Sequence, residues 1–530
     1  MKFLSRSLLI LLALYGLVFA LGDAYLVRRG APSWALVLFP VCSLALQFLL
    51  GPWIIQWLLD ISWVDGLPSA NWEFIQKVCA ERGIEVPRVG IIYSGTPNAF
   101  CFGHFPGNAR LVVTKGLLDV LTPEEVNAVL AHELGHIKHW DFVVMTLASL
   151  APLLLYQIYI IAKRIDNLRV VGYSAYLCYW FSQFIVLLLN RTRESYADHY
   201  SAQVTGAPDT LASALIKIAY GMVRAEGEYR ETLQSGFDKG EKARVRRERR
   251  VTGALGVMGI SSLGASRSLA LGVADPAQAA AVMRWDLVNP WARLYQLNST
   301  HPLTAMRVRE LNRDAEAMHQ PVRYPLPEGE SMHWGLFPLE AFLWAAPVVS
   351  LVLLLAAVLE PRWLTFLNIN LSSEANVALL IFTGVAWMFR TLFRYHGEFE
   401  DATVASLIQD VEVSQMRPRA VRIKGEIVGK GVPGFFWSSD LVLRDPSGII
   451  FILYRQTIPL MRFLFAIKAQ DLIGQDVEIE GWFRRGLAPY VEMSSLTQKY
   501  GTRHRAYSRW VQQGLAAIAI VIGMIWLKGI

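Results

Sequence analysis

Residues 121–141 read LTPEEVNAVLAHELGHIKHWD, and the rest of the chain is interpreted around this stretch. Its apolar residues recur at helical spacing, which predicts a helix. Thr122 and Glu125 form the pattern of a capping box, and Pro123 suits the first helical position. Residues 132–136 form the motif H-E-x-x-H, and residues four apart on a helix point from one face.

Two histidines at this spacing can bind one metal ion. We predict that His132 and His136 hold a single Zn²⁺ and that Glu133 takes a proton from a water on the metal. The motif alone also arises by chance in unrelated helices. A third ligand elsewhere in the chain would separate the two explanations.

Residues 190–198, NRTRESYAD, supply a candidate for that ligand. Glu194 and Asp198 are four residues apart and share a helical face. We predict Glu194 as the third ligand and Asp198 as the acceptor of the outward N–H of a ligand histidine. The alternative is a solvated acidic pair. Position favours the metal site, because the two motifs flank an apolar hairpin at about residues 143–189 that would bring them together.

Two further residues of the first stretch remain open. Asp141 is either another acceptor for a ligand histidine or a plain helix-end residue. His139, close to the same face as His136, is interpreted as a surface histidine.

Composition indicates a membrane protein. Of 530 residues, 53% are hydrophobic and 17 are Trp, which is typical of chains with membrane spans. We predict membrane hairpins in residues 1–60, 143–189 and 331–395, and a short apolar run at residues 514–528 that is a candidate last span. The first apolar run, residues 8–21, could instead be a signal peptide.

Charge and cysteine content limit the expected partners and the fold class. The net charge of +7 is explained by basic flanks of membrane spans, and no RNA-binding signature accompanies it, so nucleic acid is not an expected partner. The four cysteines include no C-x-x-C pair, which argues against a disulfide framework. We predict an integral multi-pass membrane protein whose large soluble segments lie on the cytoplasmic side.

The C-terminal third differs from the rest. Residues 411–496 contain short alternating runs separated by Gly- and Pro-rich turns, which predicts a small β-barrel of the OB or SH3-like kind. Such a domain is either a folded appendage or a site that recruits a protein partner. The insertion at residues 222–299 carries a basic run, 239–250, that is either a solvated loop or a lipid-binding segment. Residues 253–272 are a candidate lid.

A family resemblance follows from the motifs together. The segments NAF (98–100), VVTKGLL (112–118), HELGHIKHWD, RESYAD and STHP with Arg307 occur in an order that resembles the membrane-embedded gluzincin peptidases typified by HtpX, and more distantly the CAAX prenyl proteases. The resemblance covers residues 98–311. It implies a protein of the bacterial inner membrane with the zinc site on the cytoplasmic side.

The resemblance implies a set of roles. His132, His136 and Glu194 would bind zinc, Glu133 would be the general base, and Asp198 would support a ligand histidine. His301 and Arg307 would face the catalytic cleft, although composition alone favours a loop histidine at position 301. The strand at Ala109–Thr114 would hold substrate; from the residues alone it is either a peptide-pairing strand or an ordinary structural one. The implied substrate-binding residues are Asn98, Ala99, Phe100, Val112 and Val113.

The sequence thus predicts a mainly α-helical polytopic membrane protein. A gluzincin-type α+β zinc peptidase domain occupies residues 61–330, and the small β-barrel follows. The expected activity is zinc-dependent hydrolysis of peptide bonds in misfolded or membrane proteins. The alternatives are a prenyl-protein protease and a non-catalytic membrane scaffold with a structural zinc site.

Overall fold

The structure is a computed structural model, and it describes most of the chain. The described residues are 33–59, 61–218, 276–327, 329–359, 372–430, 439–457, 459–469, 471–486, 489–498 and 503–529. Three expectations from the sequence lie outside them: the first apolar run at residues 8–21, the basic run at 239–250 and the candidate lid at 253–272.

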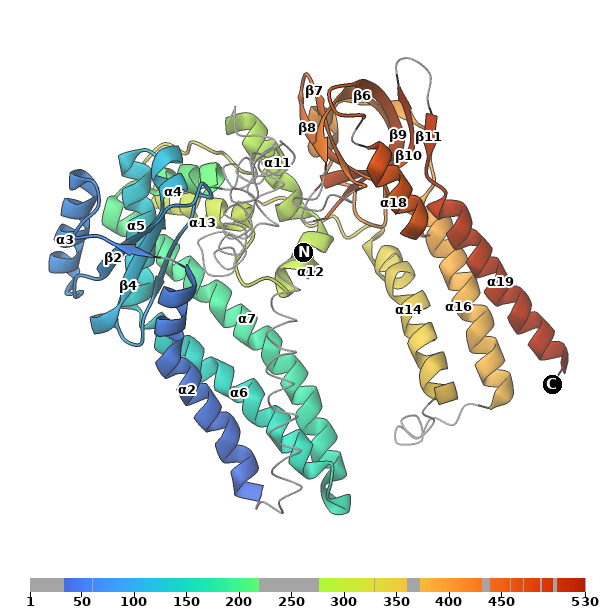
Figure 1. The fold of residues 1–530 in the computed structure, drawn as a ribbon, viewed down its shortest axis with the longest axis horizontal. Helices are drawn as coiled ribbons and strands as arrows, with labels where there is room; N and C mark the ends of the chain where they lie inside the picture. Colours follow the sequence, from blue (N-terminus) through green and yellow to red (C-terminus); the bar gives the residue numbers. More distant parts are fainter. Residues whose placement is uncertain are drawn as a thin grey trace. The chain divides into compact units, whose positions relative to one another are not determined.

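The chain divides into two compact units, and each is described by itself. Unit 1 comprises Met1–Met283 and Leu294–Leu326, and unit 2 comprises Arg284–Arg293 and Pro327–Ile530. Figure 1 shows that long helices and a folded part with strands occur in both units.

Six of the described helices are long and apolar enough to cross a membrane. In unit 1 they are α2 (Ser33–Leu59), α6 (Asp141–Ala162) and α7 (Arg169–Thr205); α6 packs against both α2 and α7. In unit 2 they are α14 (Phe337–Leu359), α16 (Ser373–Arg394) and α19 (Ser508–Gly529), and α16 packs against the other two. The predicted polytopic helical class is confirmed, and the last apolar run lies in a helix of spanning length.

The folded part of unit 1 contains a four-stranded sheet in the order β1-β2-β4-β3. Its strands are β1 (Ser62–Trp63), β2 (Arg88–Ile92), β3 (Ala99–Phe102) and β4 (Arg110–Thr114). β4 runs parallel to β2 and antiparallel to β3. The helices of this part are α3 (Ser69–Arg82), α4 (Lys115–Val120), α5 (Pro123–Lys138) and α13 (Thr304–Ala317).

Helix α5 is the helix predicted from residues 121–141. The Glu125 N–H donates to the Thr122 hydroxyl (3.3 Å) and the Thr122 N–H donates to the Glu125 carboxylate (3.0 Å), so the capping box forms. The helix ends at Lys138, and Trp140 then adopts a left-handed conformation (φ 59°). This turn lets α6 begin at Asp141, directly beside the end of α5.

Helix α7 joins two features that the sequence presented separately. The fourth apolar run and the NRTRESYAD segment belong to one helix of 37 residues. Gly135 of α5 lies against it: a Cβ built on Gly135 would stand 3.2 Å from the Cα of Ala197. The absence of a side chain at Gly135 therefore permits the close approach of α5 and α7.

Unit 2 contains the predicted barrel. The strands β6 (Arg419–Lys430), β7 (Leu441–Asp445), β8 (Gly448–Leu453), β10 (Pro489–Gln498) and β9 (Asp476–Arg485) pair in that order, and β9 pairs back with β6, so the ring closes. Two short strands of this unit were not predicted, β5 (Glu400–Asp401) and β11 (Arg503–Arg505). Nor were the helices α17 (Val404–Ile408), which precedes β6, and α18 (Pro459–Lys468), which lies between β8 and β9.

We predict that Gly135→Ala destabilises unit 1. The added methyl group would meet Ala197 and Tyr200 at 3.2 Å, which forces α7 away from α5 and should cost about 1–3 kcal/mol. Thermal unfolding of the detergent-solubilised protein should show a lower melting temperature. The matched control is Gly51→Ala in α2, where a Cβ meets nothing within 4 Å. An unchanged melting temperature for Gly135→Ala would contradict the close packing.

Candidate metal centre

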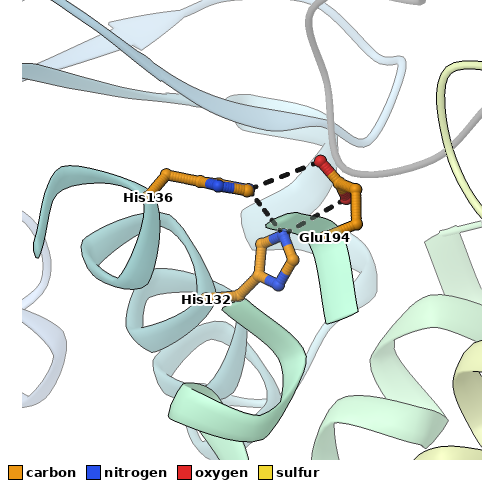
Figure 2. Close-up of side chains that lie close together, drawn as sticks. All are labelled: His132, His136 and Glu194. Carbon is orange, nitrogen blue, oxygen red and sulfur yellow. Dashed lines mark hydrogen bonds and ion pairs between the residues drawn. The ribbon is translucent and has the colours of Figure 1, made fainter. Parts of the chain in front are cut away.

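Two helices of unit 1 bring three ligand-type side chains together. Helix α5 contributes His132 and His136, and α7 contributes Glu194; all three are buried. Figure 2 shows the two imidazole rings and the carboxylate facing one another. The two Nε2 atoms are 3.2 Å apart, and Glu194 oxygens lie 3.7 Å from His132 Nε2 and 3.5 Å from His136 Nε2.

These distances fit a shared metal ion. Ligands about 2.0–2.2 Å from a tetrahedral zinc ion stand roughly 3.3–3.5 Å from one another. The three measured separations lie near that range. The donor set of two imidazoles and one carboxylate is also one that zinc accepts in catalytic sites.

The outer nitrogens of both imidazoles face carboxylates. His132 Nδ1 lies 2.9 Å from Asp198 Oδ1, and His136 Nδ1 lies 2.5 Å from Asp141 Oδ2. A proton on each Nδ1 satisfies these carboxylates, which leaves two Nε2 lone pairs pointing at each other. The Glu194 carboxylate is buried beside these two lone pairs. A cation between the three side chains would satisfy all of these atoms.

The electrostatics of the pocket also favour positive charge. Burial by itself would lower the pKa of His136. Its hydrogen bond to Asp141, together with the charges of Glu194 and Glu133, outweighs burial and raises this pKa above its usual value. A site that stabilises a proton on a buried imidazole would also stabilise a metal cation in its place.

Arginines hold the carboxylates behind the histidines. Arg307 of α13 donates two hydrogen bonds to Asp198, at 2.7 and 2.6 Å. Its guanidinium therefore holds the carboxylate that faces His132 Nδ1. Its Nη1 also lies 3.9 Å from Glu194 Oε2, so Arg307 reaches the ligand cluster as well as its support. Its expected place at the catalytic cleft stays a prediction, and the bonds to Asp198 give it a positioning role beside that. Arg193 Nε lies 2.9 Å from Asp141 Oδ1 and supports His136 in the same way. Asp141 is therefore more than a plain helix end.

His301 lies at the metal centre. Its Nδ1 is 3.1 Å from Glu194 Oε2, and the residue is 8% exposed. The loop that carries it is fixed by α7, because Asn190 donates to the carbonyl of Thr300 and Arg191 donates to that of Ser299. The helix that supplies the carboxylate also places this histidine.

Glu133 is buried on α5 between the two histidines. Its carbonyl accepts a hydrogen bond from the thiol of Cys101 on β3, at 3.5 Å. Burial and the neighbouring Glu133 raise the pKa of Cys101 well above its usual value, so this thiol stays protonated. Strand β3 therefore runs directly beside the motif helix.

The predicted substrate strand requires a correction. The Ala109–Thr114 segment contains β4, which has β2 on one side and β3 on the other, and Val112 and Val113 are fully buried. An extended peptide has no open edge to pair with there. The open edge belongs to β3, with Ala99 and Phe100, because no other described strand pairs with it. Asn98 is held at its start, since the Thr114 N–H donates to its carbonyl.

Sequence reasoning missed Arg191 and Arg193. Both lie in the quoted NRTRESYAD segment, three residues and one residue before Glu194, respectively. The signal was present: basic residues beside an acidic motif that is expected to be buried need carboxylate or carbonyl partners. What the sequence could not give was the identity of those partners, Asp141 and the 296–301 loop.

Comparisons with known proteins point to one family. The model of peptidase family M48 matches residues 73–315. A protease HtpX homolog of Methanothermobacter thermautotrophicus is 38% identical over 223 residues, which are 41% of this chain and 86% of the relative. A protease HtpX homolog of Moorella thermoacetica is 33% identical over 236 residues, covering 42% and 77%. The crystal structure of S. mikatae Ste24p is similar with a TM-score of 0.35 and 16% identity, covering 58% of this chain and 65% of that one.

We predict that Arg307→Lys weakens metal binding. Lysine cannot form the two parallel bonds to Asp198, so His132 loses its fixed orientation, and affinity should fall about 10- to 100-fold. The measurement is chelator competition on the purified protein. The control is Arg313→Lys, an exposed arginine on the same helix, which should leave affinity unchanged. Equal affinities for all three proteins would contradict the positioning role.

Proposed function

This chain belongs to peptidase family M48 and is a membrane-bound metallopeptidase, and from that premise we propose that zinc bound by His132, His136 and Glu194 is its catalytic metal. The observation that carries the proposal is the convergence of three ligand atoms, all within 4.8 Å of one another, from two separate helices. The outer nitrogen of each histidine already faces a carboxylate.

In the proposed mechanism Glu133 is the general base and His301 assists. A zinc ion in this site supplies a Lewis acid that lowers the pKa of water and polarises a carbonyl. Glu133 accepts the proton of the attacking water and returns it to the leaving amine. His301 donates a hydrogen bond to the developing oxyanion, and its position beside the Glu194 carboxylate supports this role. Asp198 and Asp141 keep both ligand imidazoles in the correct tautomer.

A protease acts on protein or peptide substrates, and we propose that β3 binds them as an extended strand. Because Asn98 and Thr114 are hydrogen-bonded partners, the alternation of an antiparallel pair turns the main-chain groups of Cys101 away from β4. They face the open edge, beside Glu133. Main-chain pairing would accept many sequences, which suits misfolded or membrane proteins as substrates.

The membrane orientation is a further proposal. Arg390 and Arg394 lie at the end of α16, and Arg505 and Arg509 lie around the start of α19, so the barrel end of unit 2 is basic. This excess of basic residues supports a cytoplasmic side for the barrel. The two ends of the α6–α7 hairpin carry similar numbers of basic residues, so the positive-inside rule does not orient this hairpin. The cytoplasmic placement of the metal centre therefore rests on the family resemblance.

Two other expectations from the sequence also remain proposals. The relatives come from an archaeon and a bacterium, so the bacterial inner membrane remains a prediction. Recruitment of a protein partner by the β-barrel remains a proposal, supported by the binding roles common to such barrels.

We predict that Glu133→Gln keeps the metal and loses peptidase activity. The amide cannot accept the proton, so hydrolysis of an unfolded model protein should fall by a factor of about 100 or more. Glu194→Gln should instead lose the metal. Both are measured by metal analysis and cleavage assays in detergent, with and without chelator. Glu124→Gln, an exposed residue of the same helix, is the matched control.

Two results would contradict this assignment. The first is full cleavage by Glu133→Gln. The second is a wild-type protein that binds one metal ion tightly but hydrolyses no unfolded substrate, which would favour a structural metal site. Cleavage restricted to a prenylated peptide would favour the prenyl-protein protease alternative.

A further inference from the structure

A basic cavity lies in unit 2 where the barrel meets the last membrane helix. It has a volume of about 250 Å³ and is lined by residues of β9 and β10, of β11 and of the start of α19. Its charged lining consists of Arg503, Arg505, Arg509 and Glu480. Three cations against one anion leave the cavity positively charged.

The single carboxylate does not balance these arginines. Glu480 pairs with Arg503 at 3.1 Å and also with Arg422, at 3.1 Å, from outside the cavity. Neither Arg505 nor Arg509 has an acidic partner among the described residues. Arg509 Nε is buried and lacks a hydrogen-bond partner in that same part of the chain. Arg505 is exposed, and Arg509 is half-buried with its guanidinium 5.4 Å from the centre of the Trp510 ring. Both charges are therefore accessible to an anion that enters the cavity.

The cavity lies at the level of a membrane surface. Helix α19 is a candidate span from Ser508 to Lys528, so the cavity borders its first turn. Tyr507 and Trp510 line the cavity and are 45% and 66% exposed. Exposed tyrosine and tryptophan beside a span are typical of the membrane–water interface.

Helix α18 adds an exposed apolar surface beside this region. Its buried Phe465 stacks on Tyr454 and meets the edge of His504, which lies between two cavity arginines in the sequence. Its outer side presents an apolar row at positions i, i+3, i+4 and i+7, flanked by Arg462 and Lys468 and consisting of Leu460, Phe463, Leu464 and Ile467. Each member of the row is at least 40% exposed. This pattern is typical of a helix that lies in the membrane interface.

We propose that this cavity binds the phosphate of an anionic phospholipid, with Arg505 and Arg509 as its charged contacts. Arginine forms strong charge-assisted hydrogen bonds to phosphate oxygens. The apolar row of α18 and the ring of Trp510 then lie against the lipid's acyl region. This apolar surface favours a lipid over a free phosphate, which would leave it in water. The barrel is thereby held against the bilayer by a specific lipid as well as by α16 and α19.

The test measures lipid binding to the full chain. Delipidated protein in detergent is titrated with phosphatidylglycerol, phosphatidylcholine or inorganic phosphate, and the bound species are counted by native mass spectrometry. The variant is Arg505→Ala with Arg509→Ala. The matched control is Lys424→Ala with Arg444→Ala, which removes two exposed charges from the barrel outside the cavity lining.

The wild-type protein should bind phosphatidylglycerol more tightly than phosphatidylcholine. The alanine variant should lose affinity for phosphatidylglycerol by about tenfold or more, as expected for two lost charge-assisted contacts. The control should bind as the wild type does. Arg505→Lys with Arg509→Lys keeps both charges and should bind better than the alanine variant, which separates loss of the site from loss of the fold.

Four outcomes would overturn the proposal. They are equal affinity in the alanine variant, an equal loss in the control, no preference over phosphatidylcholine, and a lysine variant no better than the alanine variant. Displacement of the lipid by an equal concentration of inorganic phosphate would assign the cavity to a free phosphate instead. None of these outcomes bears on the metal centre, because the measurement involves no peptidase activity.

Discussion

The close packing of α5 against α7 is the constraint on which the metal centre depends. α5 carries two imidazoles and α7 carries one carboxylate, and Gly135 against Ala197 lets the two backbones approach. The α6–α7 hairpin brings the two ligand-bearing segments together. α6 begins at Asp141, and the part of α7 from Arg169 to Arg193 is of nearly the same length as α6, so Arg193 returns to the level of Asp141. α7 is roughly 55 Å long, well beyond the 30 Å hydrocarbon core, and its last turns can serve a site outside the membrane.

The second requirement is charge balance in a buried place. Glu133, Glu194, Asp198 and Asp141 are all nearly inaccessible to water. Isolated buried carboxylates would be costly, and each of the two that support a histidine has an arginine as well. One arginine comes from α7 and the other from α13, more than 100 residues later. The metal centre is therefore complete only when the segment after residue 276 folds back onto α7.

The sequence was informative wherever the signal was local. The capping box of α5, the ligand spacing, the apolar spans and the alternating barrel strands could all be read from short windows. What it could not give depends on pairing between distant segments. Whether β4 or β3 forms the sheet edge depends on strand order, and the direction of Arg307 depends on where α13 lies. α18 is a short apolar run whose amphipathic character shows only once its inner face packs on Tyr454.

The arginines of the two units differ in whether an acidic side chain of the same chain pairs with them. In unit 1, Arg307 and Arg193 each contact an aspartate of the same chain, and the negative charge that remains faces a pocket suited to a cation. In unit 2, Arg484 is likewise buried and has Glu492 at 2.8 Å. Arg505 and Arg509 lack such a partner among the described residues, although the barrel supplies carboxylates to other arginines. Arg505 is exposed and Arg509 is half-buried, so their charges stay accessible at the start of a membrane span, where the anionic phosphate of a lipid can pair with them.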